Sequence, residues 1–140
     1  MSETRHRSPV HPDIDEALIR ELVAAFYARV QQHPRLGALF ADGMRRSWDA
    51  HRAQMVRFWS SVMLKSGSYH GRPMQAHRHL GDLRGEDFDL WLDLFADTAE
   101  SLMAPEVAAL FVERARRIAA SLRLGLTYDP AAMAPAPPLA

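Results

Sequence analysis

The sequence predicts an all-α fold, and two observations lead to this class. Across residues 13–125 the apolar side chains recur every three or four positions, which is the spacing of one face of an α-helix. No segment alternates polar and apolar residues over the length of a half-buried strand. A length of 140 residues favours a single domain, and it is enough to bury a core.

Composition excludes several classes of function. The chain has no cysteine, so disulfides, thiolate metal ligands and cysteine nucleophiles are absent. Its 17 basic and 17 acidic residues balance, so no excess charge attracts nucleic acid or an anionic membrane. The N-terminus has no apolar signal segment, and no apolar run is long enough to cross a membrane. We therefore expect a cytoplasmic protein that binds neither nucleic acid nor membrane.

The two ends of the chain differ in composition from its middle. Residues 1–12 are polar and contain two prolines, which predicts a flexible lead-in. Residues 126–140 form a Pro/Ala-rich tail with four prolines in its last eleven positions, a composition typical of disorder. The predicted domain therefore spans residues 13–125.

The first predicted helix begins at Asp13, whose carboxylate can cap it, and ends at His33 because Pro34 follows. Its buried stripe is expected to contain Ile14, Leu18, Leu22, Phe26 and Val30. Residues 35–40 are expected to add one or two helical turns.

A second long helix is predicted to start after the cap residue Ser47 and to end before Gly67. Its apolar face would contain Trp48, His51, Met55, Phe58 and Val62. A loop then leads to a short helix from Pro73 through Leu80, because proline suits the first turn of a helix.

Two further helices complete the predicted fold. The first starts near Glu86, and its inward residues would be Phe88, Trp91, Phe95, Thr98 and Leu102. The last starts at Pro105 and is expected to stop at Gly125. Its inward residues would be Val107, Phe111, Ile118 and Leu122.

No phosphate-binding loop, paired carboxylate site or nucleophile motif is visible. The remaining candidates for a functional site are histidines and aromatic residues with polar tips. His51 projects from an apolar stripe, either as a core residue or toward a ligand cavity. Tyr27 and Trp91 belong to buried faces, where each is either ordinary packing or a hydrogen-bond donor. His77 and His79 lie on different sides of a helix, so they do not readily share one metal ion. Of the two, His77 shares the apolar face.

Five short motifs, taken in order, resemble the group III truncated haemoglobins. They are Phe26-Tyr27; Leu36-Gly37-Ala38-Leu39-Phe40; Trp48-x-x-His51 followed by Phe58-Trp59; Tyr69-x-Gly71-x-Pro73-Met74-x-x-His77-x-x-Leu80; and Trp91-Leu92-x-Leu94-Phe95. Each motif is weak alone, but their order and spacing together are specific. The resemblance covers nearly all of residues 13–125, and the charged connector 79–86 departs from it.

The resemblance implies a truncated globin fold, a helical sandwich around haem b, with His77 as the proximal ligand of a five-coordinate iron. It places Tyr27, His51 and Trp91 around the distal side, where a diatomic ligand binds. It implies contacts with the cofactor from Phe40, Met55, Phe58, Trp59 and Trp91. Oxygen becomes partly negative when bound, so the Tyr27 hydroxyl and the Trp91 indole N–H suit it as donors. His51 could either donate or swing outward as a gate.

Three functions compete on these observations. The first is reversible binding of oxygen, nitric oxide or carbon monoxide by a monomer. The second is redox catalysis on the same haem (nitric oxide dioxygenation or peroxidase-like turnover), which would need an external reductase because the chain has no reductase domain. The third is a helical interaction module without a cofactor. That module leaves unexplained why His77 and three polar-tipped rings share inward faces.

Overall fold

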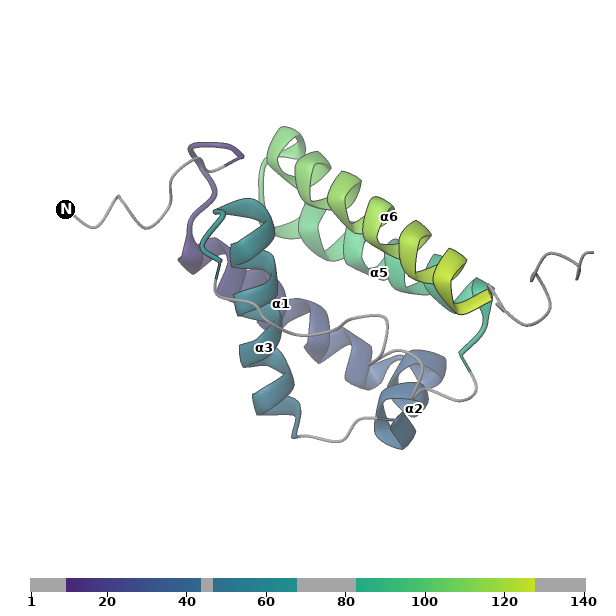
Figure 1. The fold of residues 1–140 in the computed structure, drawn as a ribbon. Helices are drawn as coiled ribbons and strands as arrows, with labels where there is room; N and C mark the ends of the chain where they lie inside the picture. Colours follow the sequence, from purple (N-terminus) through teal and green to yellow (C-terminus); the bar gives the residue numbers. More distant parts are fainter. Residues whose placement is uncertain (1–9, 44–46, 68–82, 128–140) are drawn as a thin grey trace, which may run out of the picture.

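The computed structural model describes residues 10–43, 47–67 and 83–127, and within these ranges the fold is all-α, as predicted (Figure 1). The helices are α1 (Glu16–Gln32), α2 (Pro34–Gly43), α3 (Trp48–Met63), α5 (Gly85–Leu102) and α6 (Pro105–Thr127). No helix in these ranges is both long enough and apolar enough to span a bilayer.

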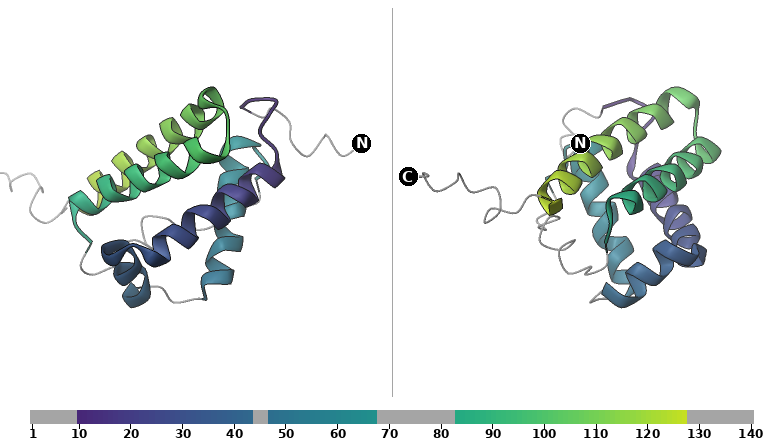
Figure 2. Two further views of the ribbon diagram at one scale, coloured as in Figure 1. Left: turned by 180° about the vertical axis from the view of Figure 1, so that it is seen from behind. Right: turned by 90° about the vertical axis from the view of Figure 1, so that its right-hand side faces the viewer.

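The helices pack in two layers (Figures 1 and 2). Helices α5 and α6 form an antiparallel pair that is joined by residues 103–104 and lies across α1 and α3. Helix α1 is central, since it contacts α2, α3 and α5. The main core forms where α1, α3, α5 and α6 meet.

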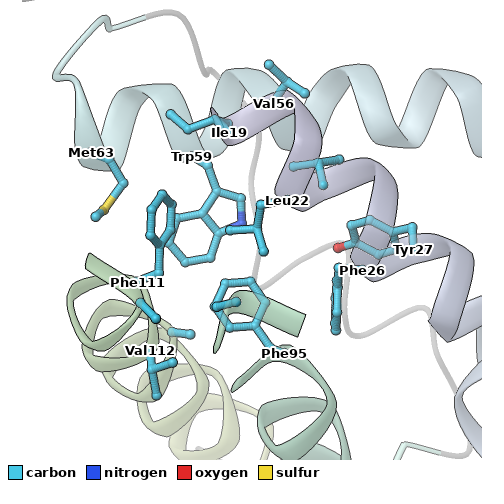
Figure 3. Close-up of a cluster of buried hydrophobic side chains, with 14 of the residues drawn as sticks. Ile19, Leu22, Phe26, Tyr27, Val56, Trp59, Met63, Phe95, Phe111 and Val112 are labelled. Atoms are coloured by element: carbon cyan, nitrogen blue, oxygen red, sulfur yellow. The ribbon is translucent and has the colours of Figure 1, made fainter. Parts of the chain in front are cut away.

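Aromatic rings fill the centre of this core (Figure 3). The Trp59 ring of α3 stacks on Phe95 of α5, with centroids 5.2 Å apart and planes 15° apart. Trp59 also contacts Phe111 of α6 at 5.6 Å, and Phe95 contacts Phe26 of α1 edge-on at 5.2 Å. These four rings join all four core helices, and aromatic pairs in such geometries add stability beyond the area they bury.

Helix α3 buries a different face from the predicted one. Its buried residues are Val56, Trp59, Ser60 and Met63. The predicted stripe is only half-buried throughout, at Trp48, His51, Met55, Phe58 and Val62. The predicted stripe therefore lies next to the fully buried one; it packs partly against the core and keeps some accessible surface.

Three helix boundaries also differ from the prediction. Helix α2 extends from Pro34 to Gly43, beyond the predicted residues 35–40. Helix α1 starts at Glu16, so its cap is Asp15, whose Oδ1 accepts the backbone N–H of Leu18 at 2.8 Å, and not Asp13. Helix α6 continues through Gly125 to Thr127, because a glycine in a helix interior weakens the helix by only about 1 kcal/mol. The cap at Ser47 is confirmed: its Oγ accepts the Ala50 N–H at 3.1 Å.

Two residues of the expected lead-in are attached to the helices. The backbone N–H of Val10 donates to the carbonyl of Met63 at 3.0 Å, and the Val10 side chain packs against the main core. The His11 ring lies 3.7 Å from the carboxylate of Glu106. This segment therefore links the end of α3 to the start of α6.

The corner between α1 and α2 is tightly built. Pro34 opens α2 at the position where a missing N–H costs nothing. The His33 Nδ1 accepts the backbone N–H of Arg35 at 3.2 Å and that of Leu36 at 3.1 Å, so it caps α2. A Cβ atom on Gly37 would lie 2.9 Å from the carbonyl oxygen of Gln31, so glycine permits the close approach of the two helices.

Candidate functional site

Tyr27 is the centre of the candidate site. It lies on α1 and is only 4% exposed. Figure 3 shows its hydroxyl directed toward the interior, beside Phe26. Within the described ranges no group hydrogen-bonds to this hydroxyl, and burial raises the pKa of the phenol far above its ordinary value. A buried donor normally has a partner, because an unpaired one costs about 1–3 kcal/mol.

The His51 ring lies directly against Tyr27. The two rings meet edge to face, with centroids 4.8 Å apart and planes at 89°. Phe40 of α2 lies 5.5 Å from His51 and 6.0 Å from Tyr27. Trp48 completes the group, 5.6 Å from Phe40 and 6.5 Å from His51. The structure therefore brings together three of the predicted site residues from three helices, with the Nε2 atom of His51 buried.

Trp91 joins this group through Phe26. The Phe26 ring meets Tyr27 at 4.8 Å and Trp91 at 5.4 Å, both edge to face. On its other side the Trp91 indole stacks on Phe95 at 5.2 Å, with planes only 8° apart. Trp91 is half-buried, and nothing in the described part of the chain accepts a hydrogen bond from its indole N–H. The predicted distal group of Tyr27, His51 and Trp91 thus forms one continuous set of rings.

The predicted cofactor contacts on α3 fall on its two faces. Met55 and Phe58 are half-buried and lie on the accessible apolar face, together with His51. Trp59 lies on the adjacent face, is 3% exposed and is packed in the core on Phe95 and Phe111. Trp59 therefore supports the site from behind.

The predicted iron ligand lies outside the described residues. His77, its neighbour His79 and the expected helix from Pro73 through Leu80 all belong to residues 68–82, so their positions stay predictions. In the remaining ranges no group of three or more histidine and carboxylate side chains is arranged to hold a metal ion.

Sequence reasoning missed three features of the site. The bridging role of Phe26 and the packing of Trp48 on His51 could have been suspected, because both residues belong to the recognised motifs. The part-buried ion pair of Arg35 with Asp87 gives no sequence signal, because its partners are 52 positions apart.

The arrangement of helices is that of a truncated globin. The crystal structure of a group III truncated hemoglobin from Campylobacter jejuni matches the chain with a TM-score of 0.77 and 28% sequence identity. The match covers 83% of this chain and 94% of that one. No family model matches the chain.

Two relatives narrow the class. The Group 3 truncated hemoglobin ctb of Campylobacter jejuni is 30% identical over 109 residues, which cover 76% of this chain and 86% of the relative. The Group 2 truncated hemoglobin YjbI of Bacillus subtilis is 30% identical over 88 residues, which cover 62% of this chain and 66% of the relative. The chain belongs to the truncated haemoglobins, and within them to group III.

Proposed function

We propose that the chain binds haem b and uses it to bind oxygen or another diatomic gas, with His77 as the protein ligand of the iron. The observation that carries this proposal is the buried Tyr27 side chain, whose hydroxyl is directed toward the interior and whose ring packs on His51 (Figure 3). Such a donor suits a small polar ligand held inside the protein. When bound, the haem supplies an iron atom that coordinates the gas.

The apolar face of α3 fits a flat apolar cofactor. Met55 and Phe58 of α3 are only half-buried by protein, and so is Phe40 of α2. These side chains keep surface that a porphyrin could cover, and each square ångström of apolar surface so covered contributes about 25 cal/mol. We assign Trp59 to the supporting core, because its ring already packs on Phe95.

The donors of the site act on the ligand by charge. The Tyr27 hydroxyl and the Trp91 indole N–H would each donate to a partly negative diatomic ligand. Each bond contributes on the order of 1–2 kcal/mol, roughly 5- to 30-fold in the rate of ligand release. We propose that His51 is a further donor, because its Nε2 is buried and its ring packs on Tyr27 and Phe40. Replacement of His51 by leucine should then change oxygen dissociation more than association.

The axial ligand can be tested with a matched pair of variants. In His77→Gly we expect loss of haem, or haem retention that depends on added imidazole, as judged from the Soret absorbance. His79→Gly, two positions away, should keep the absorbance of the wild type. A wild-type protein that takes up no haem, or a dependence on His79 with none on His77, would overturn the assignment.

The physiological reaction needs a separate measurement. Oxygen dissociation and nitric oxide consumption by the ferrous protein distinguish reversible binding from dioxygenation. Slow oxygen release without nitric oxide consumption supports a binding function. Rapid consumption that continues only with an added electron donor supports the redox alternative.

A further inference from the structure

Asp87 is the one charged side chain that is buried among the residues described by the structure. It lies in the first turn of α5, and Arg35 of α2 binds it at two points. The guanidinium donates from Nε to Oδ1 and from Nη2 to Oδ2, both at 2.8 Å. The backbone N–H of Arg84 also donates to Oδ2, at 2.7 Å. A two-point contact of this kind fixes the relative angle of its partners as well as their distance.

The Arg35 end of this pair is rigidly attached to α1. The backbone N–H of Arg35 is held by His33, the residue that follows α1. Two residues further along α2, Gly37 makes its close approach to the carbonyl of Gln31. The guanidinium therefore projects from a corner that moves with α1, the helix that carries Tyr27.

The Asp87 end of the pair is connected to the candidate site along α5. Trp91 follows Asp87 by four positions, so the two lie on the same face one turn apart. Among the described residues, the next polar contact of α5 with α1 or α2 is that of Arg29 with the Thr98 hydroxyl at 3.1 Å, two turns beyond Trp91. The start of α5, and with it the indole of Trp91, is therefore located against the α1–α2 corner by the Arg35–Asp87 pair together with the contact of Trp91 with Phe26.

The two-point geometry of this pair suits it to fix the position of α5 against α2. Stability alone would not require such a pair, because other contacts could supply it. A buried ion pair can often be replaced by well-packed apolar groups without loss of stability. The ring contact between α1 and α5 at this point, that of Phe26 with Trp91 at 5.4 Å, sets the separation of the two rings but permits one to slide past the other. A two-point charged contact resists such sliding.

We propose that the Arg35–Asp87 pair is a positioning clamp, which fixes the start of α5 against the α1–α2 corner and so holds the Trp91 indole at a set distance from the Tyr27 hydroxyl. The part of this inference that concerns ligand release rests on the proposed function. Arg35 and Asp87 act through Trp91 and do not themselves touch the ligand.

The test uses Arg35→Lys in the full chain, because lysine keeps the charge and loses the planar two-point contact. We expect oxygen dissociation from the ferrous protein to become at least about 3-fold faster, while carbon monoxide dissociation changes less than about 2-fold. The matched control is Arg20→Lys, which makes the same change in an exposed pair with Glu16 on α1. It should leave both rates unchanged. Val107→Ala, a core truncation in the first turn of α6, controls for a general loss of stability.

Two further readouts separate positioning from stability. In the Trp91→Phe background Arg35→Lys should have no further effect on oxygen dissociation, because the group it positions is gone. In the wild-type background Arg35→Lys should shift the NMR resonance of the Trp91 indole N–H, measured in the carbon monoxide complex or, for a chain that holds no haem, in the protein as purified. Asp87→Asn should shift the same resonance in the same direction.

Three results would overturn the clamp. One is an indole resonance that stays in place in both Arg35→Lys and Asp87→Asn. Another is an equal acceleration of oxygen release in Val107→Ala. The last is a full effect of Arg35→Lys in the Trp91→Phe background. The NMR measurement is informative even if the chain binds no haem, so failure of the clamp and failure of the proposed function can be told apart.

Discussion

Replacement of Tyr27 by phenylalanine is expected to change two properties in opposite directions. The ring contacts with Phe26, Phe40 and His51 involve only the ring, which phenylalanine keeps. The Tyr27 residue is only 4% exposed, and a hydroxyl held in such surroundings without a hydrogen bond costs about 1–3 kcal/mol. Taking the lower end, Tyr27→Phe should stabilise the protein without a gaseous ligand by about 1 kcal/mol. That corresponds to a rise in melting temperature of about 3 °C.

The same substitution should weaken the hold on a polar ligand. Loss of one hydrogen bond to a partly charged oxygen molecule is expected to speed its release roughly 5- to 30-fold. Carbon monoxide carries less negative charge, so its release should change less. The measurements are urea unfolding of the ferrous protein under argon, and stopped-flow release of each gas.

Thr98 offers a matched control with a satisfied hydroxyl. Thr98 is fully buried, its hydroxyl donates to the Leu94 carbonyl at 2.8 Å, and it accepts from Arg29. Thr98→Val should therefore destabilise the protein by about 1–2 kcal/mol and leave gas release unchanged. If Tyr27→Phe lowered stability as Thr98→Val does, the Tyr27 hydroxyl would have a partner inside the protein, and the reasoning behind the site would fail.

Three further predictions concern the framework of the site. Gly37→Ala places a Cβ against the backbone of α1 and should cost about 1–3 kcal/mol of stability, with altered NMR shifts for the Phe40 ring. The Arg35 guanidinium lowers the pKa of Asp87, so its stabilising effect is complete above the pKa of an unfolded aspartate (about 3.9) and is lost as the pH falls through the lower folded value. Urea unfolding should show wild type and Asp87→Asn converging below about pH 4, and parallel curves would contradict the pair. Lys65 has a φ of 59°, so Lys65→Gly should stabilise the protein by about 1 kcal/mol and thereby raise the urea midpoint.

The sequence was a sufficient guide wherever structure depends on neighbours along the chain. Three- and four-residue periodicity located α1, α3, α5 and α6, because one turn of helix is set by local backbone geometry. Ser47 as a cap and Pro34 as the break between two helices are also local effects. The motifs around Tyr27, His51 and Trp91 identified the family, which the relatives confirm.

Periodicity alone could not separate the two apolar faces of α3. Successive residues are 100° apart, so the stripe through Met55 and Phe58 and the stripe through Val56 and Trp59 are adjacent and similarly apolar. Only the packing of Trp59 on Phe95 shows which stripe faces the core. The predicted cap of α1 was wrong for a similar reason. Asp13 and Asp15 can both cap a helix, and only the start of α1 at Glu16 identifies Asp15 as the cap.

Contacts between residues distant in the chain were decided by the tertiary structure. Arg35 and Asp87 are each ordinary surface residues by type, and only the approach of α2 to α5 buries the carboxylate and pairs it. Likewise, Phe26 links Tyr27 to Trp91 because α1 and α5 pack together. From the sequence came the helices, the family and the candidate site residues, since these follow from local geometry and short motifs. The clamp, the ring contacts and the orientation of α3 depend on how whole helices pack. That packing is decided by contacts between residues far apart in the sequence, which no short segment contains.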